Sequence, residues 1–145
     1  MKIKIRKFSL TDTKAIIRLW KACGLVVPDN NPLKDIQRKR KEHPELFLVA
    51  VENGKLVGTV MGGYDGHRGA INYLAVAANF QHRGIGQLLM SEVEARLRKL
   101  GCPKINLFVR ITNGKVKKFY QKLSYTKNKV ATSYGKRLIK DSRSS

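Results

Sequence analysis

The stretch Leu74–Gly101, LAVAANFQHRGIGQLLMSEVEARLRKLG, predicts the end of a strand, a basic glycine-rich loop and an amphipathic helix. Apolar residues recur at every fourth position of the helix, and a glycine and a proline follow it: Ile85, Leu89, Val93, Leu97, Gly101 and Pro103. One face of the helix is therefore expected to lie in the core and the other in solvent.

The loop that enters this helix, residues 81–86 (QHRGIG), suits an anion. Its two glycines have no Cβ, so the backbone can approach a ligand closely. Amides without intrahelical partners, the helix dipole and Arg83 would together favour a phosphate. A tight turn without a ligand explains the six residues equally well when they are taken alone.

The neighbouring segments favour a ligand-binding loop over a simple tight turn. An apolar strand, residues 70–76, precedes the loop, and a second one, residues 105–109, follows the helix. This is a β-loop-α-β unit, in which a ligand binds at the carboxyl end of the first strand. The pattern is not a dinucleotide-binding fingerprint, because Gly-x-Gly-x-x-Gly is absent, and it is not a Walker loop, because no Gly-Lys-Ser or Gly-Lys-Thr is present.

Residues 76–86 resemble motif A of the GNAT acetyltransferases, whose Gln/Arg-x-x-Gly-x-Gly/Ala loop holds the coenzyme A pyrophosphate. Downstream, Asn113, the pair Phe119-Tyr120 and residues 123–125 (LSY) resemble the second signature of that family. The resemblance covers the whole chain. Residues 61–69 (MGGYDGHRG) resemble the small bacterial YpeA-like branch in particular.

The resemblance implies an α/β fold. The expected architecture is a single mixed, mostly antiparallel sheet of about seven strands, flanked by about four helices and splayed at its central parallel strand pair. It also implies acetyl-CoA as the cofactor. The backbone of Leu74, Ala75 and Val76 would hold pantetheine. The pyrophosphate would be bound by Gln81, His82, Arg83, Gly84, Ile85, Gly86 and Gln87.

The resemblance further assigns three catalytic or cofactor roles. The Leu74 amide would polarise the thioester carbonyl, Asn113 would touch the cofactor arm, and Tyr120 would donate a proton to the leaving thiolate. Tyr120 also lies on an apolar helix stripe with Val116 and Phe119, so core packing is an alternative role for it. Both roles can coexist.

The general base is not apparent in the sequence. Ala70 and Phe108 stand where family members that acetylate lysines or protein N-termini carry a glutamate. A water-relayed proton path is therefore expected, with Tyr73, Asp65 and His67 as local candidates. The alternative for Asp65 and His67 is that they only shape their turn. Ser124 replaces the usual family glycine, and no proline stands between Val76 and Gln81; both departures concern local geometry.

Length and cysteine usage bound the class of protein. The 145 residues suit one domain spanning residues 1–145, with a polar tail at residues 141–145 that is expected to be disordered. Cys23 and Cys102 form no CxxC or Cys/His cluster, so a reduced cytoplasmic setting and no metal are expected. No apolar run approaches the length of a membrane span, so no membrane partner is expected.

The charge is extreme, with 30 Lys plus Arg against 10 Asp plus Glu and a formal net charge of +20. Such a field attracts polyanions. Coenzyme A phosphates explain only a few of these charges, so an acidic substrate, a ribosome or a nucleic acid stays open beside a merely solvated surface. A nucleic-acid partner is not favoured, because no recognised nucleic-acid fold is present and the basic residues are spread along the chain.

The remaining segments predict further elements. A strand is expected over residues 2–7, a helix ending at Gly24, and a basic helix from Pro32 to about His43. Asn53-Gly54 predicts a type I′ hairpin between strands at residues 46–52 and 56–61, and a second reversal runs through residues 65–69. A helix from about Asn113 is followed by a last hairpin over residues 127–140.

The sequence is compatible with two functional classes. One is an N-acetyltransferase that acts on a primary amine, either a small molecule or a peptide. The other is a coenzyme A-binding or polyanion-binding protein on the same fold with little turnover. The intact glycine loop favours the enzyme. A homodimer is left open.

Overall fold

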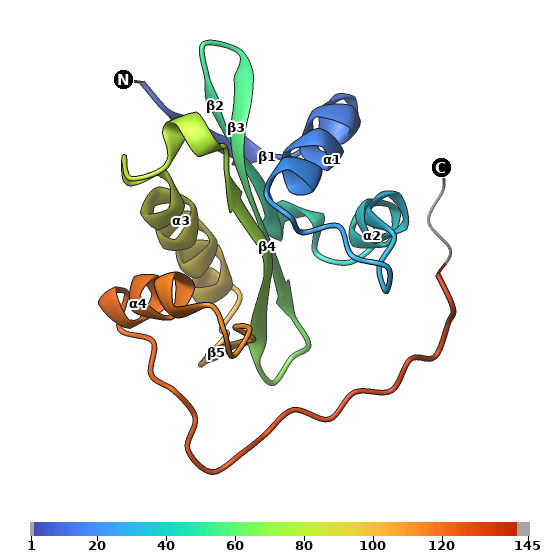
Figure 1. Cartoon of the computed structure of the whole chain (residues 1–145), viewed down its shortest axis with the longest axis vertical. Coiled ribbons are helices and arrows are strands. Elements are labelled where there is room, and N and C mark those ends of the chain that lie inside the picture. The colour runs from blue at the N-terminus through green and yellow to red at the C-terminus, as the bar shows by residue number, and fades with distance from the viewer. Residues whose placement is uncertain (1, 142–145) are drawn as a thin grey trace. The chain divides into compact units, whose positions relative to one another are not determined.

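The computed structural model describes residues 2–141, and its five strands form one sheet in the order β1-β2-β3-β4-β5 (Figure 1). The strands are β1 (Lys4–Lys7), β2 (Phe47–Glu52), β3 (Lys55–Tyr64), β4 (Gly69–Val76) and β5 (Ile105–Leu107). The α-helices are α1 (Thr13–Ala22), α2 (Pro32–Lys39), α3 (Ile85–Lys99) and α4 (Gly114–Lys122). Single 3-10 turns precede α1, β2 and α3: η1 (Leu10–Asp12), η2 (Pro44–Leu46) and η3 (Ala78–Phe80).

The first four strands form an antiparallel meander, and β5 then joins β4 in parallel. The predicted type I′ turn between β2 and β3 is confirmed, because both central residues have positive φ: Asn53 at 49° and Gly54 at 76°. The second reversal is closed by a bond from the Asp65 amide to the Arg68 carbonyl of 3.2 Å. The expected mixed sheet with one parallel pair is therefore present.

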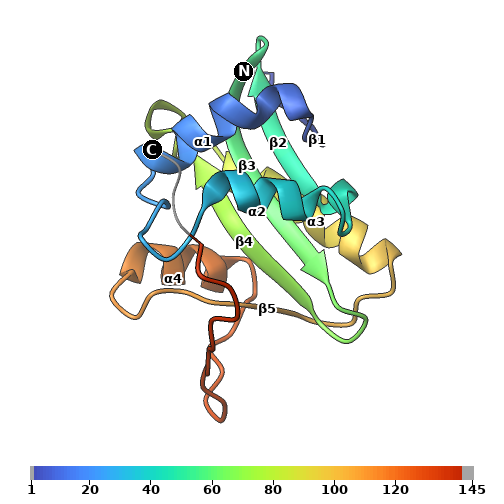
Figure 2. The same cartoon turned by 90° about the vertical axis from the view of Figure 1, so that its right-hand side faces the viewer.

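The helices of this sheet cover both of its faces (Figures 1 and 2). Helices α1 and α2 cover one face, where Trp20 and Ile36 pack with Phe47, Val49 and Met61 in one core cluster. Helix α3 covers the opposite face, and its predicted apolar stripe is confirmed, because four residues are at most 1% exposed: Ile85, Leu89, Val93 and Leu97. Alternation of side chains along the strands supplies both faces with apolar groups.

A glycine in β3 sets how closely α3 approaches the sheet. A Cβ on Gly62 would lie 2.6 Å from the Cγ2 atom of Val93, well inside van der Waals contact. Only a residue without a side chain allows α3 to pack at this distance. The position of α3 matters because its N-terminus carries the predicted anion loop.

The chain divides into two compact units. The N-terminal unit holds the sheet and ends at Leu107, and the C-terminal unit comprises Phe108–Asp141. Within the C-terminal unit, α4 is the regular element, and Tyr120, Phe119 and Tyr125 make edge-to-face ring contacts. The single-domain span predicted for residues 1–145 stays a prediction.

Three expectations about the elements need correction. The sheet has five strands rather than about seven, because residues 127–140 form no hairpin. Val130, Tyr134 and Leu138 of that segment are exposed, and an isolated two-stranded hairpin without a packed face is marginal in water. Helix α2 ends at Lys39 instead of about His43, since His43 adopts a left-handed conformation before Pro44. Of the predicted tail, residues 142–145 lie outside the described residues.

Candidate active site

The central feature of the site is a bulge in β4. Thr59 of β3 pairs with Ala75, but Met61 pairs with Asn72, so Tyr73 and Leu74 lie opposite Val60 alone. Tyr73 has a φ of 52°, which is rare for a residue with a bulky side chain. Two residues against one is the definition of a β-bulge, which bends the strand and redirects its side chains and amides.

Buried contacts hold this bulge in place. The ring of Trp20, on α1, stacks on the Tyr73 ring with centroids 3.7 Å apart and an angle of 9°. The Trp20 Nε1 group donates to Thr59 Oγ1 at 2.9 Å, and that hydroxyl donates to the Tyr73 carbonyl at 2.8 Å. The unusual backbone of Tyr73 is therefore over-determined by its surroundings, as is typical of functional sites.

Parallel pairing along β4 stops before the bulge. The register with β5 covers Gly69–Ile71 only, whereas β4 continues to Val76. The three predicted pantetheine-binding residues, Leu74, Ala75 and Val76, lie beyond this point. The side chain of Ala75 is buried, and those of Leu74 and Val76 are half-buried. A strand edge without a parallel partner can bond an extended ligand, as a further strand would.

The glycine loop follows directly from this strand end. Gln81 Nε2 donates to the Val76 carbonyl at 3.1 Å, so the loop is tied to β4. His82 and Gly84 have φ values of 64° and 84°, and the residues from Gln81 to Gly84 are exposed. The first amide to bond within α3 is that of Leu88, which donates to the Gly84 carbonyl at 3.0 Å.

The amides of Ile85, Gly86 and Gln87 therefore precede the first helical hydrogen bond and have no acceptor in the helix. Arg83 lies over the Phe80 ring at 5.2 Å, which holds its guanidinium beside the loop. The structure thus brings together the seven residues predicted to bind pyrophosphate. Their amide donors and positive charge fit the phosphates of coenzyme A.

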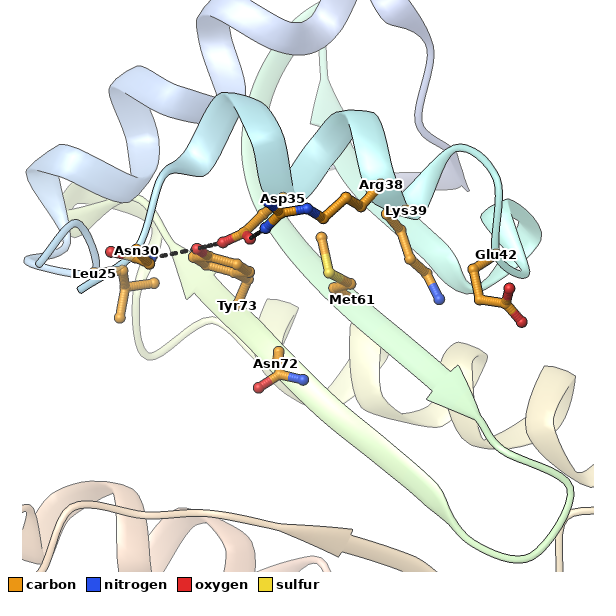
Figure 3. A pocket seen from close by; sticks show the side chains of 9 residues that line it. All are labelled: Leu25, Asn30, Asp35, Arg38, Lys39, Glu42, Met61, Asn72 and Tyr73. Atoms are coloured by element: carbon orange, nitrogen blue, oxygen red, sulfur yellow. Dashed lines mark hydrogen bonds and ion pairs between the residues drawn. The ribbon is translucent and has the colours of Figure 1, made fainter. Parts of the chain in front are cut away.

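A cavity of about 610 Å³ adjoins the bulge (Figure 3). It is lined by residues of α2, of the segment before α2, and of β3 and β4: Leu25, Asn30, Asp35, Arg38, Lys39, Glu42, Met61, Asn72 and Tyr73. The Tyr73 hydroxyl donates to Asp35 Oδ2 at 2.5 Å and accepts a bond from the Asn30 side-chain amide. Burial and the Asp35 carboxylate raise the pKa of Tyr73, so its phenol stays protonated at neutral pH.

Two predicted site residues belong to the C-terminal unit. Asn113 is the N-cap of α4, where its Oδ1 atom accepts the Val116 amide at 3.2 Å. Tyr120 is 8% exposed, with its ring centroid 5.2 Å from that of Phe119 and 5.5 Å from that of Tyr125. Burial raises the pKa of Tyr120 to about 12. The packing role considered for Tyr120 is therefore real, and its phenol keeps a proton to donate.

The structure distinguishes the candidate positions for the general base by their exposure and hydrogen bonds. Ala70 is exposed on β4 and brings no carboxylate, and the same holds for Phe108, which is 81% exposed. Asp65 accepts the amides of His67 and Arg68 at 2.7 Å each, so it shapes its turn, and these bonds lower its pKa. The residue that sequence reasoning missed is Asp35, because only the fold brings it to Tyr73, thirty-eight positions along the chain.

Metal and membrane features are absent from the part of the chain that the structure describes. Within residues 2–141, no three His, Cys, Asp or Glu side chains gather closely enough to hold a metal ion. No helix in the same range is long and apolar enough to cross a bilayer.

Known proteins share both the sequence and the fold. Residues 13–125 match the Acetyltransferase (GNAT) family. A protein of Pectobacterium atrosepticum named as an acetyltransferase is 50% identical over 139 residues, which are 96% of this chain and 98% of that protein. Ard1 from Thermoplasma volcanium superposes with a TM-score of 0.77 at 26% identity, covering 87% of this chain and 84% of that one.

A third match concerns the fold alone. The structure of AAC(6')-Iy in complex with the bisubstrate analogue CoA-S-monomethyl-acetylneamine superposes with a TM-score of 0.78 at 19% identity, over 94% of this chain and 99% of that one. Together the sequence matches define an acyltransferase. The chain belongs to the GNAT acetyltransferase family, which uses acetyl-CoA to acetylate amine acceptors. Membership of the YpeA-like branch stays a prediction.

Proposed function

We propose that this chain transfers acetyl from acetyl-CoA to the nitrogen of a primary amine by direct attack. The observation that carries the proposal is the bulge at Tyr73 and Leu74, which lies where the β4–β5 pairing has ended and is followed by the amide-rich start of α3. One arrangement thus supplies a strand edge for the cofactor arm and an anion site for its phosphates. The alternative, a coenzyme A-binding protein with little turnover, would use the same strand edge and anion site, so measured turnover separates the two.

The chain's own residues hold acetyl-CoA in this proposal. The backbone of Leu74, Ala75 and Val76 bonds the pantetheine arm, and residues 81–87 bind the pyrophosphate through amides and Arg83. The family resemblance adds Asn113 as a contact of the arm. When bound, acetyl-CoA supplies an activated acetyl group and a thiolate leaving group.

Two groups act on the thioester and its leaving sulfur. The Leu74 amide donates a hydrogen bond to the thioester oxygen as negative charge develops there. Tyr120 gives its proton to the sulfur as the carbon–sulfur bond breaks, and it matches the family tyrosine at this role. Its burial and raised pKa support this assignment, because a general acid must keep its proton until it is needed.

Tyr73 and Asp35 take the amine proton. The Tyr73 hydroxyl accepts a proton from the attacking nitrogen while its own proton passes to the Asp35 carboxylate at 2.5 Å. Asn30 fixes the hydroxyl from the other side. Tyr73 lies in the bulge itself, and the pair takes the role of the glutamates that are missing at Ala70 and Phe108.

Release of coenzyme A thiol tests the proposal. With acetyl-CoA and a panel of small amines, amino acids and peptides, release should rise with acceptor concentration, and mass spectrometry should find acetyl on the acceptor nitrogen. Tyr73→Phe keeps the ring that stacks on Trp20 but removes the relay, so the amine-dependent rate should fall by about a hundredfold.

The matched control is Tyr64→Phe, which also removes one hydroxyl. Tyr64 ends β3 and bonds the Gly66 carbonyl in an exposed turn, so its loss should leave the rate unchanged. Thiol release at one rate with and without every amine would contradict the function. An unchanged amine-dependent rate in Tyr73→Phe would contradict only the relay.

A further inference from the structure

The cavity beside Tyr73 is lined by several charged side chains, and not all of them take part in the proposed reaction. Asp35 is engaged by Tyr73 and lies 3.8 Å from the Arg38 guanidinium. Glu42 is exposed at the edge of the cavity. This leaves Lys39, which lies in the last turn of α2 and lines the same cavity.

Lys39 is buried although it is a lysine. Its residue is 8% exposed, and Figure 3 shows its side chain running from α2 toward β3, between Met61 and Glu42. Its Nζ atom lies 3.9 Å from the point where a Cβ on Gly63 would stand. Among residues 2–141, no carboxylate comes within the 4.0 Å of an ion pair and no acceptor bonds this ammonium.

The ammonium itself is not sealed in the core: within residues 2–141, the one fully buried side-chain nitrogen or oxygen that lacks a hydrogen bond is Glu52 Oε2, so Lys39 Nζ opens onto the cavity. Burial lowers the pKa of Lys39, and the more distant Glu45 and Glu42 only partly offset this. The ammonium nevertheless keeps three hydrogen-bond donors directed into a cavity large enough for a small ligand. An anionic oxygen group placed there would satisfy them.

We propose that Lys39 binds an anionic oxygen group of the acceptor, either a carboxylate or a phosphate, so that the acceptor is an amine that also carries a negative charge. The inference rests on the proposed function, because it places the acceptor in the cavity that Tyr73 lines. The net charge of +20 agrees with it, since such a field concentrates acidic ligands near the protein.

Matched pairs of acceptors test the inference. β-Alanine is compared with β-alaninamide for the carboxylate, and phosphoethanolamine with ethanolamine for the phosphate. The wild type should prefer one anionic member over its neutral partner by about ten- to a hundredfold in kcat/KM, the range of a charge-assisted hydrogen bond. The pair that shows the preference identifies the group.

Two variants separate Lys39 from the overall charge. Lys39→Met keeps the length of the stem and its packing but removes the ammonium. Lys41→Met removes the same charge from an exposed site just beyond α2 that does not line the cavity. The preference should vanish in Lys39→Met and persist in Lys41→Met. Loss of the preference in both variants, or its retention in both, would overturn the proposal.

A binding measurement keeps the test independent of turnover. N-Acetyl-β-alanine, N-acetyl-β-alaninamide and inorganic phosphate are titrated to millimolar concentration while the methyl resonance of Met61, which lines the cavity, is followed by NMR. An anionic probe should shift this signal in the wild type and in Lys41→Met, but not in Lys39→Met. Equal shifts from the neutral amide, or no shift with any anion, would refute the Lys39 site, while thiol release with other amines would still support the proposed function.

Discussion

Gly84→Asp should lower the affinity for acetyl-CoA by about a hundredfold or more, because opposing like charges costs several kcal/mol. Gly84 is the N-cap of α3, with a φ of 84°. An aspartate there puts a carboxylate beside the three amides that precede the first helical hydrogen bond, where the pyrophosphate is proposed to lie. The change is measured by isothermal titration calorimetry.

Two substitutions separate charge from backbone strain. Gly84→Asn is nearly isosteric with aspartate and also tolerates left-handed φ, but it is neutral, so it should retain most of the affinity. Gly66→Asp introduces the same strain at a φ of 90° in the exposed turn after β3, and it should bind acetyl-CoA as the wild type does. A folded Gly84→Asp variant with unchanged affinity would remove the α3 loop from the cofactor site.

Tyr120→Phe should lower turnover by about 10²- to 10⁴-fold, the range of general acid catalysis, while melting temperature and acetyl-CoA affinity stay close to those of the wild type. The ring, and with it the contacts to Phe119 and Tyr125, is retained. Only the proton for the thiolate is lost. Single-turnover kinetics with saturating acetyl-CoA measure the chemical step.

The pH profile gives a second reading of Tyr120. A phenol whose pKa is raised to about 12 keeps its proton at lower pH. Deprotonation of Tyr120 should therefore not reduce wild-type turnover between about pH 7 and about pH 10. Tyr125→Phe, which removes a neighbouring hydroxyl in the same unit, serves as the control and should turn over normally. If Tyr120→Phe is as active as this control, Tyr120 is a packing residue and the proton comes from elsewhere.

Local sequence patterns predicted most of the regular elements. The type I′ turn at Asn53-Gly54 and the stripe from Ile85 to Leu97 depend on residues close in the chain, and both are confirmed. The prediction of a hairpin over residues 127–140 was wrong, because the local sequence does not show whether such strands have a partner to pack against. Short-range chemistry specifies turns and helix faces better than long-range strand pairing.

The site residues, like the regular elements, were predictable where they are close together in the sequence and not where the fold brings them together. The glycine loop is a contiguous motif, so its residues could be named from the sequence. The bulge could not be, because it is a mismatch in register between β3 and β4 that leaves no mark in the order of residues. The partnership of Tyr73 with Asp35 and the burial of Lys39 likewise arise only when α2 packs across the sheet.

The central claim is that the bulged end of β4 and the start of α3 form one acetyl-CoA site. Titration of the ¹⁵N-labelled chain with acetyl-CoA, followed through its backbone amide resonances, tests it most directly. The largest shifts should fall on Leu74–Val76 and on Gln81–Gln87, and both sets should saturate at the same ligand concentration. Saturable binding that leaves both sets unshifted, or that shifts amides elsewhere in their place, would contradict it.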